Sequence, residues 1–203
     1  MKLYTAPATP FGRTVEIVVH ELDLQNTVDV VATPVKPTEP NKDYQAIAPL
    51  RRIPTLQLDD GTVLVDSAVI CEFLAVHARD MGLFAQDRPE RFTVLSDYAI
   101  ARGMCECAVA TRYEEAVRPE DKRWPAWSDD MMDKVDGGLA YFEASSVPQD
   151  GPLTIAKISL GALLGYLDFR FAHKDWRRAY PKLAAWFAVV NERPSFAATT
   201  PRG

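Results

Sequence analysis

The chain has 203 residues, of which 47% are hydrophobic and 25% charged, and its formal net charge is -5. A chain of this length buries about 70% of its unfolded surface on folding, so it needs neither a disulfide nor a metal to hold a core. The composition is that of an ordinary globular protein and excludes a disordered or fibrous chain. The acidic balance argues against a nucleic-acid partner, because nucleic-acid-binding proteins usually carry a clustered basic face.

The sequence shows neither a secretory signal nor a membrane span. Arg13 and Glu16 interrupt what would be the apolar core of a signal peptide, and residues 158–167 are too few and too glycine-rich to cross a bilayer. We therefore expect a cytoplasmic protein with no membrane partner. The cysteines of the chain are Cys71, Cys105 and Cys107. They lack the two-residue spacing of a redox pair, so we expect them to pack as small hydrophobes, and we expect no metal site.

The first half of the chain predicts alternating strands and helices. The expected elements are a strand at 3–5, a helix at 11–22, a strand at 28–32, an irregular segment with at most a short helix at 34–49, and strands at 55–58 and 62–65 around a tight Asp-Gly turn. Asp66 and Ser67 then offer capping side chains for a further helix. The apolar positions of that helix that should rest on the sheet are Val69, Ile70, Phe73, Leu74 and Val76. The order is βαβ followed by ββα, with the first two strands parallel.

From about residue 88 the pattern becomes entirely helical. The expected helices are 89–116, 128–146, 154–171 and 181–191, joined by connections at 124–127 and 147–152. We place a first domain at 1–78, a linker at 79–88 and an all-helical domain at 89–203. The mixed charges of 118–123 predict a solvated loop. Gly161 and Gly165 lie one helical turn apart and predict the close approach of another helix.

Two segments carry a family resemblance. The run Ala48-Pro49-Leu50-Arg51-Arg52-Ile53-Pro54 is similar to Asn-Pro-Leu-Gly-Lys-Val-Pro, and Asp66-Ser67 follows at the matching spacing. With the βαβ-ββα order and the helical half, these motifs resemble the cytosolic glutathione S-transferases. Residues 164–170 and 193–196 are similar to a bacterial branch of small stand-alone transferase-like proteins. The resemblance covers almost the whole chain and implies a thioredoxin-like α/β N-terminal domain joined to an all-α C-terminal domain, the glutathione transferase architecture.

The resemblance also implies how glutathione is held. Pro54 takes the place of the family's cis-proline, and Ile53 that of the residue whose backbone N–H and C=O pair with the cysteinyl part of the tripeptide. Ser67 would receive the γ-glutamyl carboxylate at a helix start, and Asp66 would orient the glutamyl end. Arg52 stands where the family has lysine and could reach the glycyl carboxylate. The alternatives are a proline that only opens an edge strand and residues that only cap a helix.

The family activates the glutathione thiol with a residue near the start of the first helix. The corresponding segment here is Thr9-Pro10-Phe11-Gly12-Arg13, so Thr9 is the candidate catalytic residue, with Thr5 and Tyr4 as rivals. Thr9 also fits a helix N-cap followed by proline at the first helical position. A hydroxyl can accept a helix N–H and still donate to a thiolate, so the two roles are compatible.

The leading hypothesis is therefore a transferase that conjugates glutathione, its co-substrate, to small electrophiles in detoxification. In the family the long first helix of the helical domain lines a second-substrate pocket, which makes Tyr98, Arg102 and Cys105 candidates. Isomerisation through the same thiolate is an alternative, whereas reduction through a mixed disulfide is disfavoured because residues 6–12 contain no cysteine. A non-catalytic glutathione-binding or partner-binding module is the third possibility. Relatives are commonly homodimers, and we expect the same here.

Overall fold

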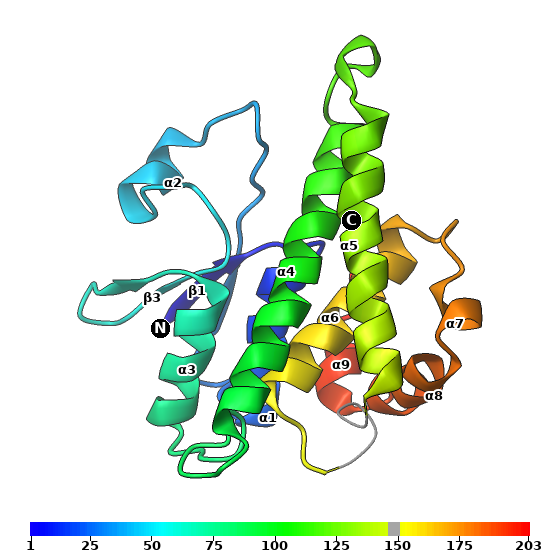
Figure 1. Cartoon of the computed structure of the whole chain (residues 1–203). Coiled ribbons are helices and arrows are strands. Elements are labelled where there is room, and N and C mark those ends of the chain that lie inside the picture. The colour runs from blue at the N-terminus through cyan, green and yellow to red at the C-terminus, as the bar shows by residue number, and fades with distance from the viewer. Residues whose placement is uncertain (146–150) are drawn as a thin grey trace.

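The structure is a computed structural model that describes residues 1–145 and 151–203. Its first half contains β1 (Lys2–Thr5), α1 (Pro10–Glu21), β2 (Asp29–Ala32), α2 (Lys42–Ile47), β3 (Thr55–Gln57), β4 (Val63–Leu64) and α3 (Ser67–His77). Its second half contains α4 (Arg91–Ala116), the 3-10 turn η1 (Glu120–Lys122), α5 (Pro125–Ala144), α6 (Ile155–Arg170), α7 (Trp176–Ala179), α8 (Pro181–Val190) and α9 (Pro194–Ala198). The thioredoxin-like α/β part and the all-helical part are the two predicted parts of the fold, and Figure 1 shows them side by side.

The four strands form one mixed sheet in the order β2-β1-β3-β4. β1 and β2 are parallel, with Leu3 opposite Val30, which confirms the predicted crossover through α1. β3 runs antiparallel to β1, with Leu3 opposite Leu56, and β4 runs antiparallel to β3. The turn between β3 and β4 uses Gly61 at a φ of 88°, a left-handed conformation that glycine adopts without steric cost.

One face of the sheet is covered by α1 and α3. Leu3 and Leu56 from the sheet are fully buried, as are Val18 of α1 and Leu74 of α3. The prediction for α3 was partly wrong, since Val69 and Val76 are 48% and 61% exposed. α3 has a second apolar stripe at positions 69, 73 and 76, and a helix can turn only one stripe toward a sheet.

The helical half is built around α6. Residues 155–167 of this helix are all buried, α4 packs along it, and α5 runs antiparallel to α4 as its long partner (Figure 1). α5 begins at Pro125, earlier than predicted, because proline suits the first helical position. The short helices α7 and α9 were not predicted, since four or five residues are too few to show a period. Most of the predicted connection at 147–152 lies outside the described residues.

Gly161 and Gly165 lie where α6 packs against α9 and α1, respectively. A methyl group on Gly161 would lie 2.5 Å from the ring of Phe196 in α9, and one on Gly165 would lie 1.9 Å from Nη1 of Arg13 in α1. The predicted close approach is confirmed, although side chains of α1 and α9 fill the space. Arg13 is 2% exposed and donates to the carbonyl of Phe196 at 3.2 Å, so it fastens α1 to α9 across α6.

The segment at 118–123 is less simple than a solvated loop. It includes η1, and the Arg118 guanidinium pairs with the carboxylate of Glu114 at 2.6 Å. Glu114 also accepts the backbone N–H of Trp124 at 2.8 Å, which ties the loop to α4. Within residues 1–145 and 151–203, no helix is long and apolar enough to span a bilayer.

Candidate functional site

The topology brings three loops to one end of the sheet. Tyr4, near the end of β1, pairs with Thr55 at the beginning of β3, so the β1–α1 loop lies beside the segment that precedes β3. Leu64 at the end of β4 pairs with Leu56, which brings the start of α3 to the same end. The residues singled out from the sequence on these three loops, around Thr9, Ile53 and Ser67, are therefore neighbours in space.

The segment ahead of β3 presents a free backbone edge. The Ile53–Pro54 peptide bond is cis, as the family resemblance implied. The Arg52 carbonyl accepts the Tyr44 hydroxyl at 2.8 Å and the Thr55 hydroxyl at 3.1 Å, which fixes the chain on both sides of the bend. Neither the N–H nor the C=O of Ile53 has a hydrogen-bond partner in the part of the chain that the structure describes. This pair can accept an extended peptide as an added strand.

Tyr44 is a supporting residue that the sequence did not reveal. It lies in the short helix α2 and is 3% exposed, and its hydroxyl also lies 2.9 Å from that of Thr55. Burial is the main reason that its pKa is raised above the ordinary value. The only sequence signal was a single tyrosine in an otherwise polar segment, which does not indicate what its hydroxyl contacts.

The start of α3 is capped as predicted. Asp66 is the N-cap residue, and its Oδ1 accepts the backbone N–H of Ala68 at 2.8 Å. The peptide bond between Val65 and Asp66 is also cis. Ser67 is the first residue of the helix, and its own N–H has no partner among the described residues. A free N–H at the positive end of a helix is suited to bind a carboxylate.

Arg102 reaches this helix start from α4. Its Nη2 lies 2.6 Å from Oδ2 of Asp66, so one oxygen of that carboxylate caps α3 and the other binds α4. The family resemblance made Arg102 a candidate for the second-substrate pocket, whereas its nearest charged partner in the structure is the capping aspartate. The guanidinium also lies 5.9 Å from the centre of the Tyr98 ring.

Tyr98 is buried beneath this ion pair, with 4% of its surface exposed. Its phenol lies next to the Ser67 hydroxyl and the Cys71 thiol. Burial raises the pKa of the Tyr98 phenol far above its ordinary value, and the nearby thiol raises it further, so the phenol is neutral. Tyr98 therefore packs against the inner side of the start of α3, next to Ser67 and Cys71.

Cys105 does not line a pocket, and that prediction was wrong. It is 1% exposed, and it lies beside Ser159 on the side of α4 that packs against α6. Burial raises the pKa of its thiol to about 12. Cys71 is equally buried and Cys107 partly so, which confirms that the cysteines pack mainly as small hydrophobes. The periodicity of α4 could not show which part of its apolar stripe faces α6.

Of the three hydroxyls considered for thiol activation, only that of Thr9 is available to a ligand. Thr5 is 1% exposed and lies against Gly12 and Glu16 in the interior. The Tyr4 hydroxyl already donates to Gln57 at 3.0 Å. Thr9 occupies the N-cap position of α1 and is partly exposed, but its side chain makes no capping hydrogen bond, contrary to our expectation.

The two arginines before Ile53 differ in their surroundings. Arg51 stands where the similar family segment, Asn-Pro-Leu-Gly-Lys-Val-Pro, has glycine. It adopts a φ of 52°, the left-handed conformation that glycine accommodates best. Its guanidinium donates to Gln45 at 3.0 Å. Arg52 is exposed, and its side chain has no ion-pair partner within the described ranges, so it remains available to an anionic ligand.

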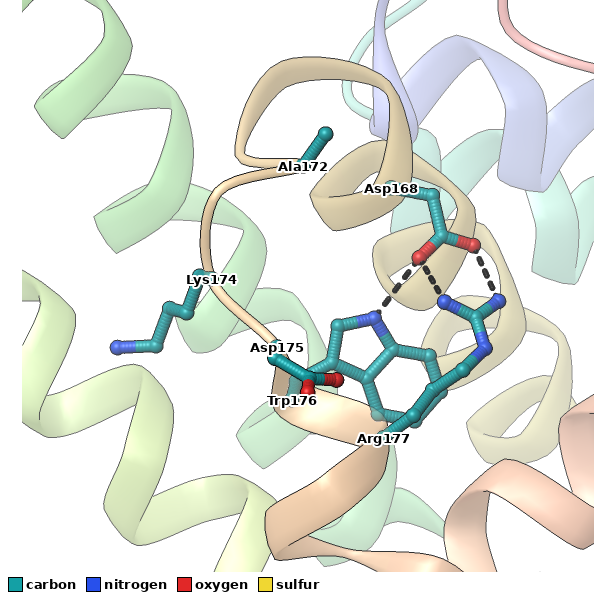
Figure 2. A pocket seen from close by; sticks show the side chains of 6 residues that line it. All are labelled: Asp168, Ala172, Lys174, Asp175, Trp176 and Arg177. Carbon is teal, nitrogen blue, oxygen red and sulfur yellow. Dashed lines mark hydrogen bonds and ion pairs between the residues drawn. The ribbon is translucent and has the colours of Figure 1, made fainter.

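A separate hollow lies around the connection between α6 and α7 (Figure 2). Asp168 accepts the Trp176 indole N–H at 2.9 Å and forms an ion pair with Arg177. Lys174 binds Asp136 at 2.6 Å, and Asp175 caps α7. The polar groups of this hollow are occupied by one another or by neighbouring helices, so it fastens α7 to α6 and offers no free group for chemistry.

Comparisons with known proteins agree with this geometry. Residues 8–77 match the family model for the glutathione S-transferase N-terminal domain, and residues 125–188 match that for the C-terminal domain. A glutathione transferase family member from Pseudomonas fluorescens Pf-5, solved with bound glutathione, is 37% identical, with a TM-score of 0.92 over 100% of this chain and 99% of that one.

Two further relatives extend the comparison. A glutathione S-transferase from Methylobacillus flagellatus, solved with glutathione bound, is 33% identical, with a TM-score of 0.87 over 99% of each chain. The uncharacterized GST-like protein YibF of Escherichia coli K12 is 26% identical over 99% of this chain and 98% of its own length. The shared fold, the two domain matches and these full-length similarities lead to one conclusion: the chain belongs to the glutathione S-transferase family.

Proposed function

We propose that the chain binds glutathione across the three loops and transfers its thiolate to a small electrophile. The observation that carries the proposal is the backbone N–H and C=O of Ile53, which have no partner among the described residues and lie beside a helix start whose Ser67 N–H has none there either. The cysteinyl backbone of glutathione would pair with Ile53, and the γ-glutamyl carboxylate would accept the Ser67 N–H. Arg52 would attract the glycyl carboxylate.

The ligands of the relatives support this arrangement. The Pseudomonas fluorescens protein was solved both with glutathione and with S-(propanoic acid)-glutathione, and the Methylobacillus flagellatus protein with glutathione. These relatives are 37% and 33% identical to this chain and align over almost its whole length. We infer that the equivalent end of the sheet binds the same tripeptide here.

Activation of the thiol is assigned to Thr9. A free thiol ionises near pH 8.5, so the protein must favour the thiolate form of bound glutathione at neutral pH. The partly exposed Thr9 hydroxyl can donate its hydrogen to a thiolate at the start of α1, where the helix dipole also favours a negative charge. The thiol proton is released to solvent, and the thiolate then attacks the electrophile. As the sulfur–carbon bond forms, a halide leaves with its electron pair, an epoxide carbon–oxygen bond opens, or the double bond of an unsaturated carbonyl opens and its carbanion is protonated by water.

The test is binding followed by turnover. Calorimetry with glutathione is expected to show saturable binding, and a panel of halogenated aromatics, epoxides and unsaturated carbonyl compounds is expected to include at least one substrate that is conjugated. Binding without turnover of any compound would favour a non-catalytic module instead. Isomerised product without net consumption of glutathione would favour the isomerase alternative.

The remaining inferences concern assembly and location. We infer two domains at 1–78 and 89–203 separated by 79–88, a cytoplasmic location, and a homodimer. The exposed apolar side chains of Val69 and Val76 on α3 and Phe92 on α4 support the dimer, because an apolar surface is stabilised by a partner that covers it. Light scattering is expected to give twice the mass of one chain, and the mass of a single chain would contradict the dimer.

A further inference from the structure

Tyr98 brings a phenol from the helical half of the chain to the start of α3. Its side chain is buried, the ring centre of Phe84 lies 6.3 Å from its own at an angle of 83°, and the Arg102 guanidinium lies over the ring. The phenol oxygen is next to the Ser67 hydroxyl and the Cys71 thiol. The packing around the ring therefore keeps this hydroxyl against the first turn of α3.

The Tyr98 hydroxyl has hydrogen-bonding capacity that the surrounding chain does not use. Its oxygen is buried, and it makes no hydrogen bond of ordinary length and angle with any residue that the structure describes. A buried hydroxyl without a partner is costly, so most such groups in folded proteins are paired. Because burial keeps the phenol neutral, it retains a hydrogen that it can donate.

Ser67 is the neighbour best suited to accept that hydrogen. A serine oxygen has two lone pairs, whereas a thiol sulfur such as that of Cys71 is a weak acceptor and the Arg102 guanidinium can only donate. The Asp66 carboxylate acts on the phenol through its charge, and both of its oxygens already have partners. Of the groups around the phenol, the Ser67 hydroxyl is thus the strong acceptor that is still available.

Ser67 also faces the proposed ligand. It is the first residue of α3, and its backbone N–H has no partner within residues 1–145 and 151–203. A serine hydroxyl that accepts a hydrogen from Tyr98 directs its own hydrogen away from Tyr98, and a hydroxyl that donates to a carboxylate becomes a stronger acceptor. Phenol, serine and ligand carboxylate can therefore form a chain in which each hydrogen bond strengthens the next.

We propose that Tyr98 is a positioning residue for glutathione: its hydroxyl donates to the Ser67 oxygen and so orients the Ser67 hydroxyl toward the γ-glutamyl carboxylate. Tyr98 touches neither the tripeptide nor its thiol, and it acts through Ser67. The proposal rests on the glutathione site proposed above and adds to it a side chain of α4, so that recognition of the glutamyl end depends on both halves of the chain.

The experiment measures glutathione affinity by calorimetry for Y98F, S67A and the double variant Y98F/S67A. Y98F keeps the ring and removes only the hydroxyl. Y166F is the matched control, because Tyr166 is equally buried, at 4% exposed, but belongs to α6 and has Arg112 and Arg170 as neighbours. The second ligand is γ-aminobutyryl-cysteinylglycine, which lacks only the γ-glutamyl carboxylate of glutathione.

Y98F is expected to bind glutathione about three- to tenfold more weakly than the unmodified protein, as the loss of one hydrogen bond between uncharged groups predicts. The same change made in S67A should alter the affinity less than about twofold, because the two hydroxyls act together. Y98F should leave the affinity for the analogue unchanged, and Y166F that for glutathione. The denaturation midpoint of Y98F should not fall, because the hydroxyl that it removes is unpaired among the described residues.

A readout on the unmodified protein needs no variant to fold. In carbon-13 NMR of tyrosine-labelled protein, the Cζ signal of Tyr98 is expected to move on saturation with glutathione, because its hydroxyl then takes part in the chain of hydrogen bonds. Saturation with the analogue should leave that signal in place.

Unaltered glutathione affinity in Y98F would overturn the proposal, and so would a loss that is equally large in the S67A background. A Tyr98 signal that glutathione does not move would overturn it as well. In each of these outcomes glutathione still binds, so the glutathione site stands. If the unmodified protein binds no glutathione, the proposed function fails and this inference fails with it.

Discussion

Replacing Thr9 with valine separates the two roles that a hydroxyl can have at the start of α1. Valine keeps the branched shape of threonine and the methyl group that packs against Gly12, and removes only the hydroxyl. Because the Thr9 side chain makes no capping hydrogen bond, we expect the free energy of unfolding to change by less than about 0.5 kcal/mol. Any larger effect on the bound thiol then reflects direct contact with the ligand.

The size of that effect follows from the strength of a hydrogen bond to a charged group. Such a bond contributes about 1.5–3 kcal/mol, and one pKa unit corresponds to about 1.4 kcal/mol. T9V is therefore expected to raise the pKa of bound glutathione by about one to two units. The contribution of the α1 dipole, about 0.3–1 kcal/mol, remains in the variant because the backbone is unchanged.

The assay is a pH titration of the ultraviolet thiolate absorbance of bound glutathione. T9S keeps the hydroxyl and serves as the matched control, so its bound thiol should titrate within about 0.3 unit of the unmodified protein. If T9V titrates at the same pH as the unmodified protein while glutathione remains bound, Thr9 does not activate the thiol.

Three further predictions concern stability and the ion pair at the site. G165A should lower the free energy of unfolding by about 1–3 kcal/mol in denaturant titrations, because the methyl group meets a buried guanidinium; its control G137A, with open space around it, should raise stability by up to about 1 kcal/mol. Burial acts to raise the pKa of Glu21, but hydrogen bonds from Arg193 and a neighbouring serine hold it below the ordinary 4.5. E21Q should therefore cost about 1 kcal/mol at neutral pH, a difference that persists above pH 4.5 and vanishes as the pH falls through the folded-state pKa; a difference that grows on acidification would contradict this. R102M should weaken glutathione binding about fivefold in calorimetry without changing the pKa of the bound thiol, because the α3 cap loses its partner; unaltered affinity would leave Arg102 without a role at the site.

The parts of the fold that depend on local chemistry were predictable. The Asp66 cap and the Asp-Gly turn each follow from residues adjacent in the chain, and the cis bond at Pro54 was implied by the family resemblance of its segment; the structure contains all three. The order of strands and helices followed from the spacing of apolar residues, which recur about every second residue in a strand and nearly every fourth in a helix. This spacing is also a property of residues close together in the sequence.

The parts that depend on long-range packing were not predictable. Arg102 binds an aspartate 36 residues away, and nothing in the spacing of α4 indicates that partner. Cys105 and Val69 each lie on an apolar stripe, but the stripe of Cys105 faces α6 and that of Val69 faces outward. Which stripe becomes buried is decided by the neighbouring elements, because a helix with two apolar stripes is compatible with either orientation.

The Thr9 side chain shows a different limit of prediction from sequence. Its position before Pro10 correctly predicted the N-cap of α1, but not that the hydroxyl would make no capping hydrogen bond. Residue type determines which bonds a hydroxyl can form, whereas the rotamer determines which it does form.

The most direct test of the account is a crystal structure of this chain grown with glutathione. The account predicts that the cysteinyl N–H and C=O of the tripeptide pair with the Ile53 backbone at about 2.9 Å, and that its γ-glutamyl carboxylate accepts the Ser67 N–H. A bound tripeptide that leaves both backbone groups of Ile53 unpaired, or that places its glutamyl end away from α3, would contradict it.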